Sequence, residues 1–375
     1  MAAEFRYREY RHGDADEINH LYATVTGRPR SIGEFQWQWL RAPGGPADIW
    51  LIEATEGRGK PKLIGHHGIM PIRFTFGAKD LRFGKTENTM VLPEYRSRIL
   101  YPRFEKRFAA QYEARFDALF STIGPSEAIR QRRALGYDFS TRWIRARIPT
   151  DKLGAVHLLC SIVLRRILGP KRTRSAGHDV HETSIDVEQC GFPLVLRGLC
   201  DNAARKDRFF ESFWPRCRTH YGVTPRRDRE DLDWRFWSNP YSEFVTLVSD
   251  SNPDNQGYVI FRRSKTEARA ALLEDIAVCN PDVSNFSCLL DSALAWMKTN
   301  QISWIDFYTT SDSGAADSLI KAAQERDIYS QSLVFRLRKQ STAMMPRKIT
   351  AKGAAAGLDT SNWFVTPILS EGRSD

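Results

Sequence analysis

Cysteine is scarce in this sequence and follows no pattern that would indicate a metal site or a disulfide framework. The 375 residues include six cysteines, and none of them forms a C-x-x-C pair or recurs at a regular spacing. Zinc sites and disulfide-rich domains depend on such spacings, so free thiols in a reducing compartment are favoured and no metal is expected. The N-terminal residues carry charge where a secretion signal needs an apolar core, so we expect a cytoplasmic protein.

The signatures of several large enzyme classes are also missing. The sequence contains no G-x-x-x-x-G-K-[ST] phosphate loop, no H-E-x-x-H pair and no G-x-S-x-G elbow. Their absence counts against NTPases, metalloproteases and α/β-hydrolases, because the chemistry of those classes needs these residues at these spacings. Evidence of function must therefore come from the charge pattern and from less regular motifs.

No apolar run is long enough to cross a bilayer. The most apolar stretch, LGAVHLLCSIVLRRILG at residues 153–169, is interrupted by Arg165 and Arg166. A membrane-spanning helix needs about 20 predominantly apolar residues. Basic residues follow at 170–174, and two interpretations stay open: a helix packed between domains, or a helix that lies on a membrane surface.

The chain is rich in the residues that build cores, and it is basic. Hydrophobic residues make up 42% of it and aromatic residues 11%, and its length suits two domains of ordinary size or one large domain. Lysine and arginine total 55 against 45 acidic residues, a formal net charge of +10. This balance favours an anionic partner, whether a nucleic acid, a phosphorylated cofactor or an acidic membrane surface.

Two stretches of the sequence are similar enough to suggest an internal duplication. Residues 35–45, FQWQWLRAPGG, align without a gap with residues 232–242, LDWRFWSNPYS. Each copy is followed in the same order by a strand-like run, a polar turn, a glycine-led strand, another apolar segment and a helix. Chance can account for two matching aromatic positions, but it accounts less readily for the same order of all the elements that follow them. We therefore predict two domains of similar plan.

Helical and strand-like segments alternate in both halves, which predicts an α/β (α+β) fold. Clear helical patterns occur, for example, at residues 14–25, 285–300 and 314–327. The expected organisation is a first domain, a basic linker or helix, a second domain and a partly flexible tail, at residues 1–150, 151–180, 181–340 and 341–375.

Residues 90–108, MVLPEYRSRILYPRFEKRF, change character halfway along. They begin as a buried strand, stop at Pro93, turn, and continue as a basic helix. A strand that leads into a helix N-terminus with arginines beside it is well suited to hold phosphates. The turn lacks the glycines that usually let phosphate oxygens approach the backbone. A working phosphate cradle, a degenerate copy and a plain basic helix therefore remain as interpretations.

Three stretches within residues 5–140 together resemble the GNAT superfamily of N-acyltransferases. Residues 7–27 resemble the first strand and helix of that family, residues 91–108 resemble its acyl-CoA loop, and residues 124–139 resemble its closing helix. With the duplication, this resemblance implies two tandem GNAT-like domains, each a mixed, mostly antiparallel sheet flanked by helices. Such an arrangement is also similar to that of Fem-type transferases.

The resemblance implies acetyl-CoA or another acyl-CoA as co-substrate. Strand and loop amides would hold it, and arginines would add charge-assisted hydrogen bonds. In the family pattern Arg/Gln-x-x-Gly-x-Gly/Ala, Ile99 and Tyr101 replace the two small residues. The cofactor-binding residues expected on this basis are Met90, Val91, Leu92, Arg96, Ser97, Arg98, Ile99, Leu100, Tyr101 and Ser126.

Acyl transfer to an amine needs a base for the ammonium proton and an acid for the leaving thiolate. Glu87 lies where some family members place a basic carboxylate, so it is the expected base, with an exposed strand-end carboxylate as the alternative. His66 and His67 must point to opposite faces of one strand, and ordinary half-buried strand residues are expected there. Many members of the family place a tyrosine, as the acid that protonates the thiolate, four residues before the glycine of the closing helix. In this sequence that position is Arg132. Asp275, at a strand end of the second half, is the other expected catalytic residue and would orient the amine.

Three functions compete on these observations. The first is an N-acyltransferase that moves an acyl group, expected to be acetyl, from acyl-CoA to a primary amine of a small molecule or cell-envelope precursor. The second is a Fem-like transferase that takes an aminoacyl group from tRNA, with an affinity that falls steeply with salt. The third is a non-catalytic binding protein on the same fold. Each of the three functions is compatible with peripheral contact with a membrane.

Overall fold

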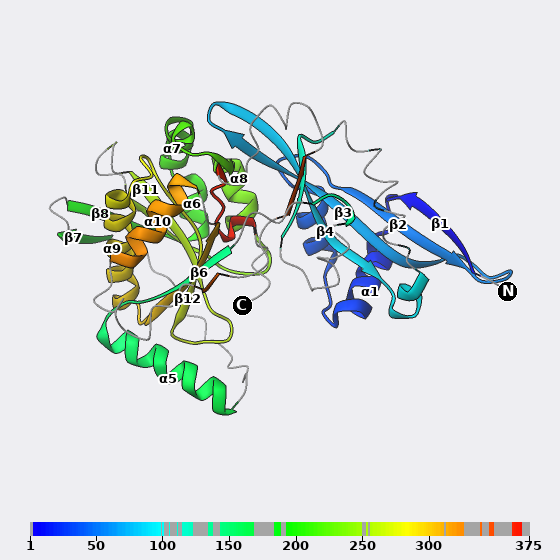
Figure 1. Cartoon of the computed structure of the whole chain (residues 1–375), viewed down its shortest axis with the longest axis horizontal. Helices are drawn as coiled ribbons and strands as arrows, with labels where there is room; N and C mark the ends of the chain where they lie inside the picture. Colours follow the sequence, from blue (N-terminus) through cyan, green and yellow to red (C-terminus); the bar gives the residue numbers. More distant parts are fainter. Residues whose placement is uncertain are drawn as a thin grey trace. The chain divides into compact units, whose positions relative to one another are not determined.

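The computed structural model shows two compact units, each built on its own mixed sheet (Figure 1). Unit 1 comprises residues 1–74, 80–140 and 342–358, and unit 2 comprises residues 75–79, 141–341 and 359–375. The residues that the structure describes are 3–98, 100, 105, 111, 115–122, 134–137, 143–168, 184–188, 193–249, 253, 256–310, 313–325, 338–339, 345–348 and 362–369.

The sheet of unit 1 runs in the order β1–β2–β3–β4–β5–β15. Its strands are β1 (Glu4–Glu9), β2 (Asp48–Thr55), β3 (Lys62–Phe76), β4 (Lys79–Val91), β5 (Ala118–Ser121) and β15 (Met345–Lys348). β1, β2 and β3 pair antiparallel, β4 pairs parallel with β5, and β15 closes the series antiparallel to β5. β3 is buried without interruption from Ile64 to Ile72, as expected for a strand covered on both faces.

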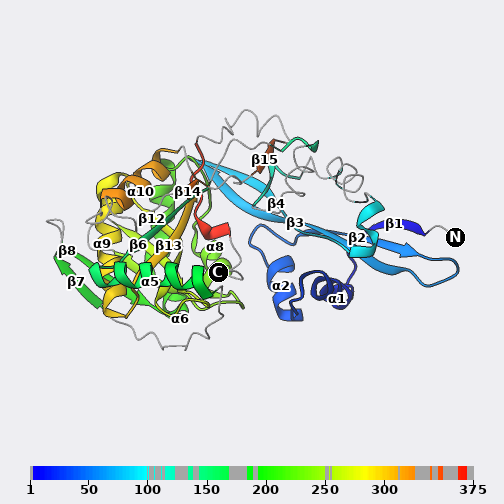
Figure 2. The ribbon, with the colours of Figure 1, turned by 60° about the horizontal axis from the view of Figure 1, so that its bottom comes forward.

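Two helices of unit 1 cover one face of the β1–β4 part of this sheet (Figure 2). Helix α1 (Ala15–Thr26) ends at Gly27, whose φ of +70° is the left-handed conformation that glycine adopts most readily. Helix α2 (Ile32–Leu40) begins with a capping box in which Ser31 and Glu34 bond to each other's backbone amides. A 3₁₀ turn, η1 (Pro93–Arg98), follows β4 where the sequence predicts that the strand stops.

The sheet of unit 2 runs in the order β14–β6–β13–β12–β11–β10–β8–β7. Its strands are β6 (Trp143–Pro149), β7 (Ser184–Glu188), β8 (Pro193–Leu199), β10 (Val245–Ser249), β11 (Gly257–Arg263), β12 (Ala270–Val278), β13 (Trp304–Thr310) and β14 (Arg338–Lys339). The β12–β13 pair is parallel and the other neighbours are antiparallel.

Several helices and short elements surround this second sheet (Figure 1). They are α5 (Lys152–Leu168), α6 (Asp201–Lys206), α7 (Phe209–Cys217), η2 (Arg218–His220), α8 (Arg229–Leu232), η3 (Asp233–Trp237), α9 (Val283–Thr299), α10 (Gly314–Glu325) and η6 (Pro367–Leu369). The short strand β9 (Val223–Pro225) pairs instead with β3. The predicted helices at residues 14–25, 285–300 and 314–327 are confirmed by α1, α9 and α10. None of the helices in the described part of the chain combines the length and apolar character needed to span a bilayer.

The two sheets share one plan, which confirms the predicted fold of two mixed sheets flanked by helices. In each unit a series of antiparallel strands ends in a parallel pair, β4–β5 in unit 1 and β12–β13 in unit 2. The aligned stretches 35–45 and 232–242 also take the same place, because α2 precedes β2 and η3 precedes β10. These correspondences fit a tandem arrangement.

The strand beyond each parallel pair comes from a distant part of the chain. In unit 1 this strand is β15, from the segment expected to be the tail. In unit 2 it is β6, which precedes the predicted linker at residues 151–180. That linker contains helix α5, and the tail also supplies the buried residues Trp363 to Thr366 of unit 2. Alternating apolar residues mark β6 as a strand, but they do not specify which sheet edge it joins, and the sequence MPRK of β15 has no such alternation.

Candidate functional site

The candidate site lies where β4 separates from β5 in unit 1. The two parallel strands pair at Phe83–Ala118, Gly84–Leu119 and Lys85–Phe120, and the paired register ends there. β4 nevertheless continues to Val91. Among the residues that the structure describes, β5 does not pair with the backbone groups of β4 beyond Lys85 on that edge.

Backbone alternation distinguishes the amide of Val91 from those of Met90 and Leu92, the neighbouring residues that are also expected to bind the cofactor. The Leu92 amide donates to the carbonyl oxygen of Ile64 on β3 at 2.9 Å, so it is already used. Successive residues of a strand direct their N–H and C=O groups to opposite edges. The Val91 amide consequently faces the β5 edge. The carbonyl oxygen of Val91 accepts a hydrogen bond from Arg96 Nε at 3.1 Å, which holds that arginine beside this edge.

The expected cofactor-binding residues are only partly covered by the described structure. Met90, Leu92 and Leu100 are buried, whereas Arg96 and Ser97 are exposed on η1. Arg98 lies on η1, but its side chain, like Ile99, Tyr101 and Ser126, lies outside the described residues, as does Arg132. The described part thus combines buried apolar anchors with exposed polar residues at the end of one strand.

An irregular residue interrupts β4 just before this edge. Asn88 has a φ of +47°, in the left-handed region that only a few per cent of non-glycine residues adopt. Asparagine tolerates this conformation better than most residues. In the sequence, Asn88 directly follows Glu87 and comes three residues before Val91, so its irregular backbone lies between the expected base and the proposed acyl-binding amide.

Two neighbouring histidines of β3 hold this part of β4. His66 Nδ1 lies 2.8 Å from the carbonyl oxygen of Asn88, and His67 Nδ1 lies 2.8 Å from Thr89 Oγ1. Both side chains are fully buried, more than the half-buried state expected from the sequence. Because a carbonyl oxygen only accepts, the His66 Nδ1 atom carries the proton. Burial lowers the pKa of His66 from 6.5 to about 3, so its ring is neutral.

Glu87 remains accessible beside this irregular residue. Its side chain is 24% exposed, and its Oε2 atom lies 2.8 Å from Nζ of Lys85, which is 3% exposed. Residues two apart on a strand share a face, so the ammonium group of Lys85 is well placed as a fixed counter-ion. A partly exposed carboxylate at this point can accept a proton from an incoming amine.

A buried polar cluster that sequence reasoning missed lies between the helices and β3 of unit 1. Arg30 donates from Nε to Asn19 Oδ1 at 2.7 Å and from Nη1 to Gln38 Oε1 at 2.9 Å. Its guanidinium carbon lies 4.5 Å from the ring centroid of Tyr22. Its positive charge also lowers the pKa of His66, after the larger effect of burial. This cluster therefore extends to the side chain that holds β4.

Trp39 completes the contact between α2 and β3. Its ring meets that of His66 edge-on, with centroids 5.1 Å apart. A Cβ atom on Gly68 would lie 2.1 Å from the Trp39 ring, so the glycine is required for this packing. Among the described residues, Trp39 Nε1, His66 Nε2 and Asn88 Nδ2 are buried without a hydrogen-bond partner. The GHHG sequence of β3 was the available signal: two glycines around two histidines permit close helix packing.

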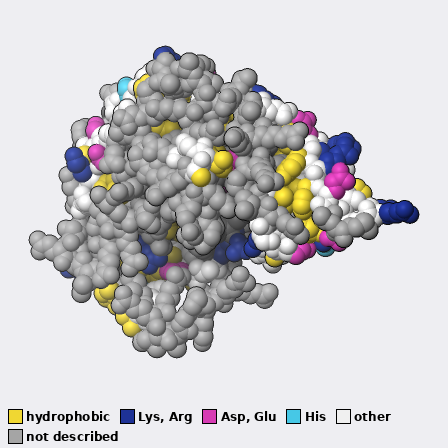
Figure 3. Space-filling model, turned by 45° about the vertical axis from the view of Figure 1, so that its right-hand side comes forward, with side chains coloured by type: hydrophobic (Ala, Val, Ile, Leu, Met, Phe, Trp, Pro, Cys, Tyr) yellow, Lys and Arg dark blue, Asp and Glu magenta, His cyan; other side chains and the backbone are white. Residues whose placement is uncertain are grey.

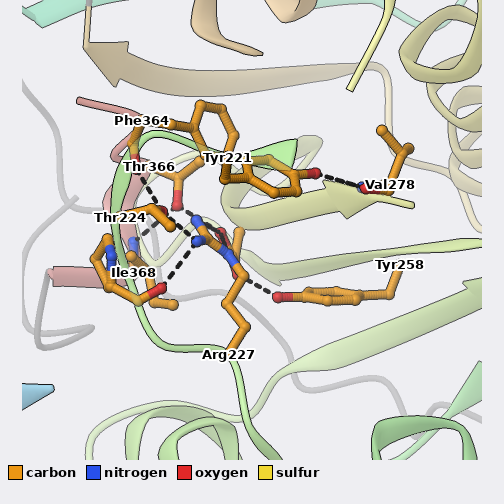
Figure 4. A network of polar contacts seen from close by, with 10 residues as sticks. Tyr221, Thr224, Arg227, Tyr258, Val278, Phe364, Thr366 and Ile368 are labelled. Atoms are coloured by element: carbon orange, nitrogen blue, oxygen red, sulfur yellow. Dashed lines mark hydrogen bonds and ion pairs between the residues drawn. The ribbon is translucent and has the colours of Figure 1, made fainter. Parts of the chain in front are cut away.

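Asp275, which was expected to orient the amine, lies in a buried network of polar side chains. Its carboxylate is fully buried and pairs with Arg227, whose Nε atom lies 3.0 Å from Oδ2 (Figure 4). It also accepts hydrogen bonds from the hydroxyls of Tyr258 at 2.6 Å and Thr366 at 2.5 Å. Arg227 in turn donates to Thr224 and lies 5.1 Å from the ring centroid of Phe364. These contacts describe an internal network of unit 2.

The chain's own C-terminal segment lies between the separated strands of unit 2. β12 and β13 pair from Ala270–Trp304 to Leu273–Phe307, as β4 and β5 do, and then diverge. Beyond that point Thr310 Oγ1, on β13, donates to the Trp363 carbonyl at 2.6 Å, and Thr366 bonds to Asp275 of β12. The equivalent of the candidate site is thus filled with protein in unit 2, which leaves unit 1 as the candidate.

Comparisons with known proteins agree with this geometry. Residues 6–140 match the family model described as the acetyltransferase (GNAT) domain. A search of curated proteins gives no match. In the described part of the chain, no three His, Cys, Asp or Glu side chains converge as a metal-binding group.

Similar solved structures cover most of the chain. A probable N-acyltransferase from Enterococcus faecalis is 11% identical, with a TM-score of 0.60, and the match covers 93% of this chain and 73% of the other. A GCN5-related N-acetyltransferase from Anabaena variabilis is 11% identical, with a TM-score of 0.59 and coverage of 94% and 74%. The N-myristoyltransferase of Saccharomyces cerevisiae, solved with bound myristoyl-CoA and inhibitors, is 12% identical, with a TM-score of 0.51 and coverage of 91% and 79%.

The fold is that of a mixed α/β protein in which a parallel strand pair diverges beside the candidate site. More particularly, residues 6–140 match the model of the acetyltransferase (GNAT) domain, and the fold of the chain is that of the N-acyltransferase and N-acetyltransferase structures named above. The predicted resemblance to this superfamily is confirmed for that part of the chain.

Proposed function

We propose that unit 1 transfers an acyl group from acyl-CoA to a primary amine of a small molecule or cell-envelope precursor. Acetyl is the acyl group that we expect. The observation that carries this proposal is the end of β4–β5 pairing at Lys85, which leaves the Val91 amide without pairing to β5 in the described part of the chain. The pantetheine chain of CoA is an extended amide-containing ligand, and it would add to that edge as a further strand does. The exposed η1 residues Arg96 and Ser97 would meet the phosphates.

In the proposed reaction, Glu87 accepts a proton from the substrate ammonium group, and the free amine attacks the thioester carbonyl. The new N–C bond forms while the carbonyl oxygen gains negative charge, which the Val91 amide stabilises. The C–S bond then breaks, the carbonyl re-forms and the CoA thiolate leaves. The remaining proton on nitrogen passes to the thiolate or to solvent. Positioning by β4 supplies much of the rate in this scheme.

The remaining expected CoA contacts keep their place in the proposal. Met90 and Leu92 would anchor the strand through their buried side chains, and Leu100 would anchor the loop. Arg98, Ile99, Tyr101 and Ser126 would line the phosphate end. We assign Asp275 to the internal network of unit 2 rather than to the reacting amine.

The two units are proposed to be tandem GNAT-like domains that arose by duplication, of which the second has lost its acyl-CoA site. Support comes from the shared strand plan and from the segment 363–366, which lies between β12 and β13. Use of acyl-CoA, a metabolite of the cytoplasm, supports a cytoplasmic location.

Calorimetric titration with acetyl-CoA and with a longer acyl-CoA, each at two salt concentrations, tests the proposal. Saturable binding at one site per chain is expected, and it would justify a screen of amine acceptors. Absence of heat with both ligands would overturn it. A steeply salt-dependent heat with tRNA instead would favour the Fem-like alternative.

The charge on the surface bears on this alternative. Figure 3 shows one face of the molecule, and on its described part lysine and arginine side chains are interspersed with acidic ones. A nucleic-acid backbone is usually bound by a continuous basic track, which this arrangement does not resemble.

A further inference from the structure

Helix α5 of unit 2 presents an apolar surface to solvent. Leu153, Val156, Leu159 and Val163 are 62%, 53%, 38% and 52% exposed. Their spacing of three and four residues places them on one face of the helix, with exposed Cys160 among them. Among the described residues, only Ile32 is a further large hydrophobic side chain with comparable exposure. We call these five residues of α5, 153, 156, 159, 160 and 163, the apolar stripe.

The opposite face of α5 is firmly packed, so the stripe is not an unpacked core face. Ala155 and Leu158 are buried against Ala270 and Trp304 of the sheet. A Cβ atom on Gly154 would lie 2.2 Å from the carbonyl oxygen of Ser303, so the helix approaches the sheet closely at its start. The helix thus has two apolar faces, of which one is used in the fold. Figures 1 and 2 both show α5 along the outside of unit 2.

After Asp151, which pairs with Lys298 and accepts a hydrogen bond from the Gly154 amide at the start of the helix, the sequence of α5 and of the segment that follows carries charge of one sign. The sequence from Lys152 to His178 contains six lysine and arginine residues and no aspartate or glutamate. These cationic residues are Lys152, Arg165, Arg166, Lys171, Arg172 and Arg174. An exposed aliphatic stripe within a purely basic stretch is the pattern of helices that lie in the interface of anionic bilayers.

We propose that α5 docks on an anionic lipid bilayer, with its axis in the plane of the interface and its apolar stripe among the upper acyl chains. Burial of the aliphatic side chains would supply the hydrophobic part of the affinity, and the basic stretch would be attracted to the lipid phosphates. A second copy of the chain fits less well, because a two-fold contact through the stripe would bring two purely basic stretches together. Docking of this kind goes beyond the acyl transfer proposed for unit 1.

Vesicle flotation tests the proposal with the full chain. We expect it to float with vesicles of phosphatidylcholine and about one-third phosphatidylglycerol, and to stay behind with phosphatidylcholine alone. Raised salt should weaken the binding. The double variant V156D/V163D should lower the partition coefficient by at least about tenfold, because it replaces two inserted aliphatic groups with charges. Ile32→Asp, which alters the exposed hydrophobic residue of unit 1, is the matched control and should float like the native chain.

A label on the stripe gives an independent readout. An environment-sensitive dye on Cys160 should shift its emission to the blue when anionic vesicles are added, and a Cys160→Ser protein should lose that signal. Equal flotation of the native and double-variant proteins would overturn the proposal, as would absence of flotation with anionic vesicles. A native dimer that the double variant converts to monomer would also overturn it, and would make a second copy the occupant. Unchanged thermal unfolding of the variants would show that they remain folded.

Discussion

The Nδ1 atom of His66 donates a hydrogen bond to the carbonyl oxygen of Asn88 over 2.8 Å, and this bond joins β3 to the irregular residue of β4. A non-glycine residue in the left-handed region costs on the order of 1–3 kcal/mol and persists only where its surroundings hold it. His66 is buried under Trp39 of α2, so helix packing supports the same contact. The backbone conformation between Glu87 and Val91 therefore depends on a side chain twenty-two residues earlier in the chain.

Replacement of His66 tests this support. His66→Ala should destabilise the protein by about 2–4 kcal/mol, because it leaves a buried carbonyl without a donor and a cavity beside Trp39. It should also lower kcat/KM for acyl transfer. In His66→Asn the side-chain amide can donate from nearly the place of Nδ1, so much of both losses should be recovered. Urea unfolding and steady-state kinetics measure the two effects, and an Asn variant no better than Ala would contradict the role.

Stability should depend on pH through the same residue. The pKa of His66 is about 3 in the folded protein because of burial, against 6.5 for the free group. The unfolded chain therefore binds the proton first as the pH falls, so the stability from the neutral ring is complete above about pH 6.5 and is lost toward pH 3. Between about pH 5.5 and 4 this residue should contribute a slope of up to about 1.4 kcal/mol per pH unit.

The control for the pH dependence is His66→Asn, whose side chain does not titrate. Urea unfolding of both proteins across this range should give a shallower slope for the variant. Equal slopes would show that other groups cause the acid sensitivity.

Arg96 should contribute to CoA binding. Its Nε atom is held by the carbonyl oxygen of Val91 at 3.1 Å, which directs an exposed guanidinium to the end of the open strand edge. Loss of a charge-assisted hydrogen bond costs about 1.5–3 kcal/mol, so Arg96→Ala should raise the Kd for acyl-CoA by at least about tenfold.

Arg58→Ala is the matched control for Arg96, because it removes the same charge from another exposed position of unit 1. Calorimetry at two salt concentrations separates a local contact from a general effect of net charge. Equal losses in the two variants would indicate the general effect, and an unchanged Kd in Arg96→Ala would count against the loop assignment.

Glu87 should act on the chemical step rather than on CoA affinity. Glu87→Gln keeps the size of the side chain but removes the proton acceptor, so kcat should fall by about 10²–10⁴-fold while the Kd for acyl-CoA stays the same. Glu4→Gln, at an exposed position on β1, is the control and should retain full activity. Full activity of Glu87→Gln at every pH would make this residue an ordinary strand-end carboxylate.

Asp275 should act on stability rather than on chemistry. Removing one partner of a buried ion pair leaves an uncompensated charge, so Asp275→Ala should destabilise unit 2 by about 3–5 kcal/mol. Binding of acyl-CoA to unit 1 should persist in protein that remains folded. Thr366→Val, which removes a single donor to the same carboxylate, should cost about 1–3 kcal/mol. A variant with native unfolding behaviour and a selective loss of kcat would restore the catalytic assignment.

The predictability of the candidate site differs from residue to residue. The position of Glu87 beside the end of β4 follows from its place in a strand-turn pattern, which depends on residues within one short window. The partners of Asp275 cannot be predicted from such a window, since Arg227 is separated from it by 48 residues and Thr366 by 91. The same applies to the Val91 amide, which is selected by the Leu92–Ile64 bond across two strands.

The sequence by itself determined the alternation of helices and strands, the similarity of two stretches and the basic strand-turn segment, because each depends on periodicity or composition along neighbouring residues. Only the tertiary structure decided that β15 and β6 lie beside the parallel strand pairs, that His66 supports Asn88, and that residues 363–366 lie between β12 and β13 of unit 2. Those features arise from contacts between segments far apart in the chain. An alternating pattern is compatible with many such pairings, and burial together with hydrogen bonding selects among them.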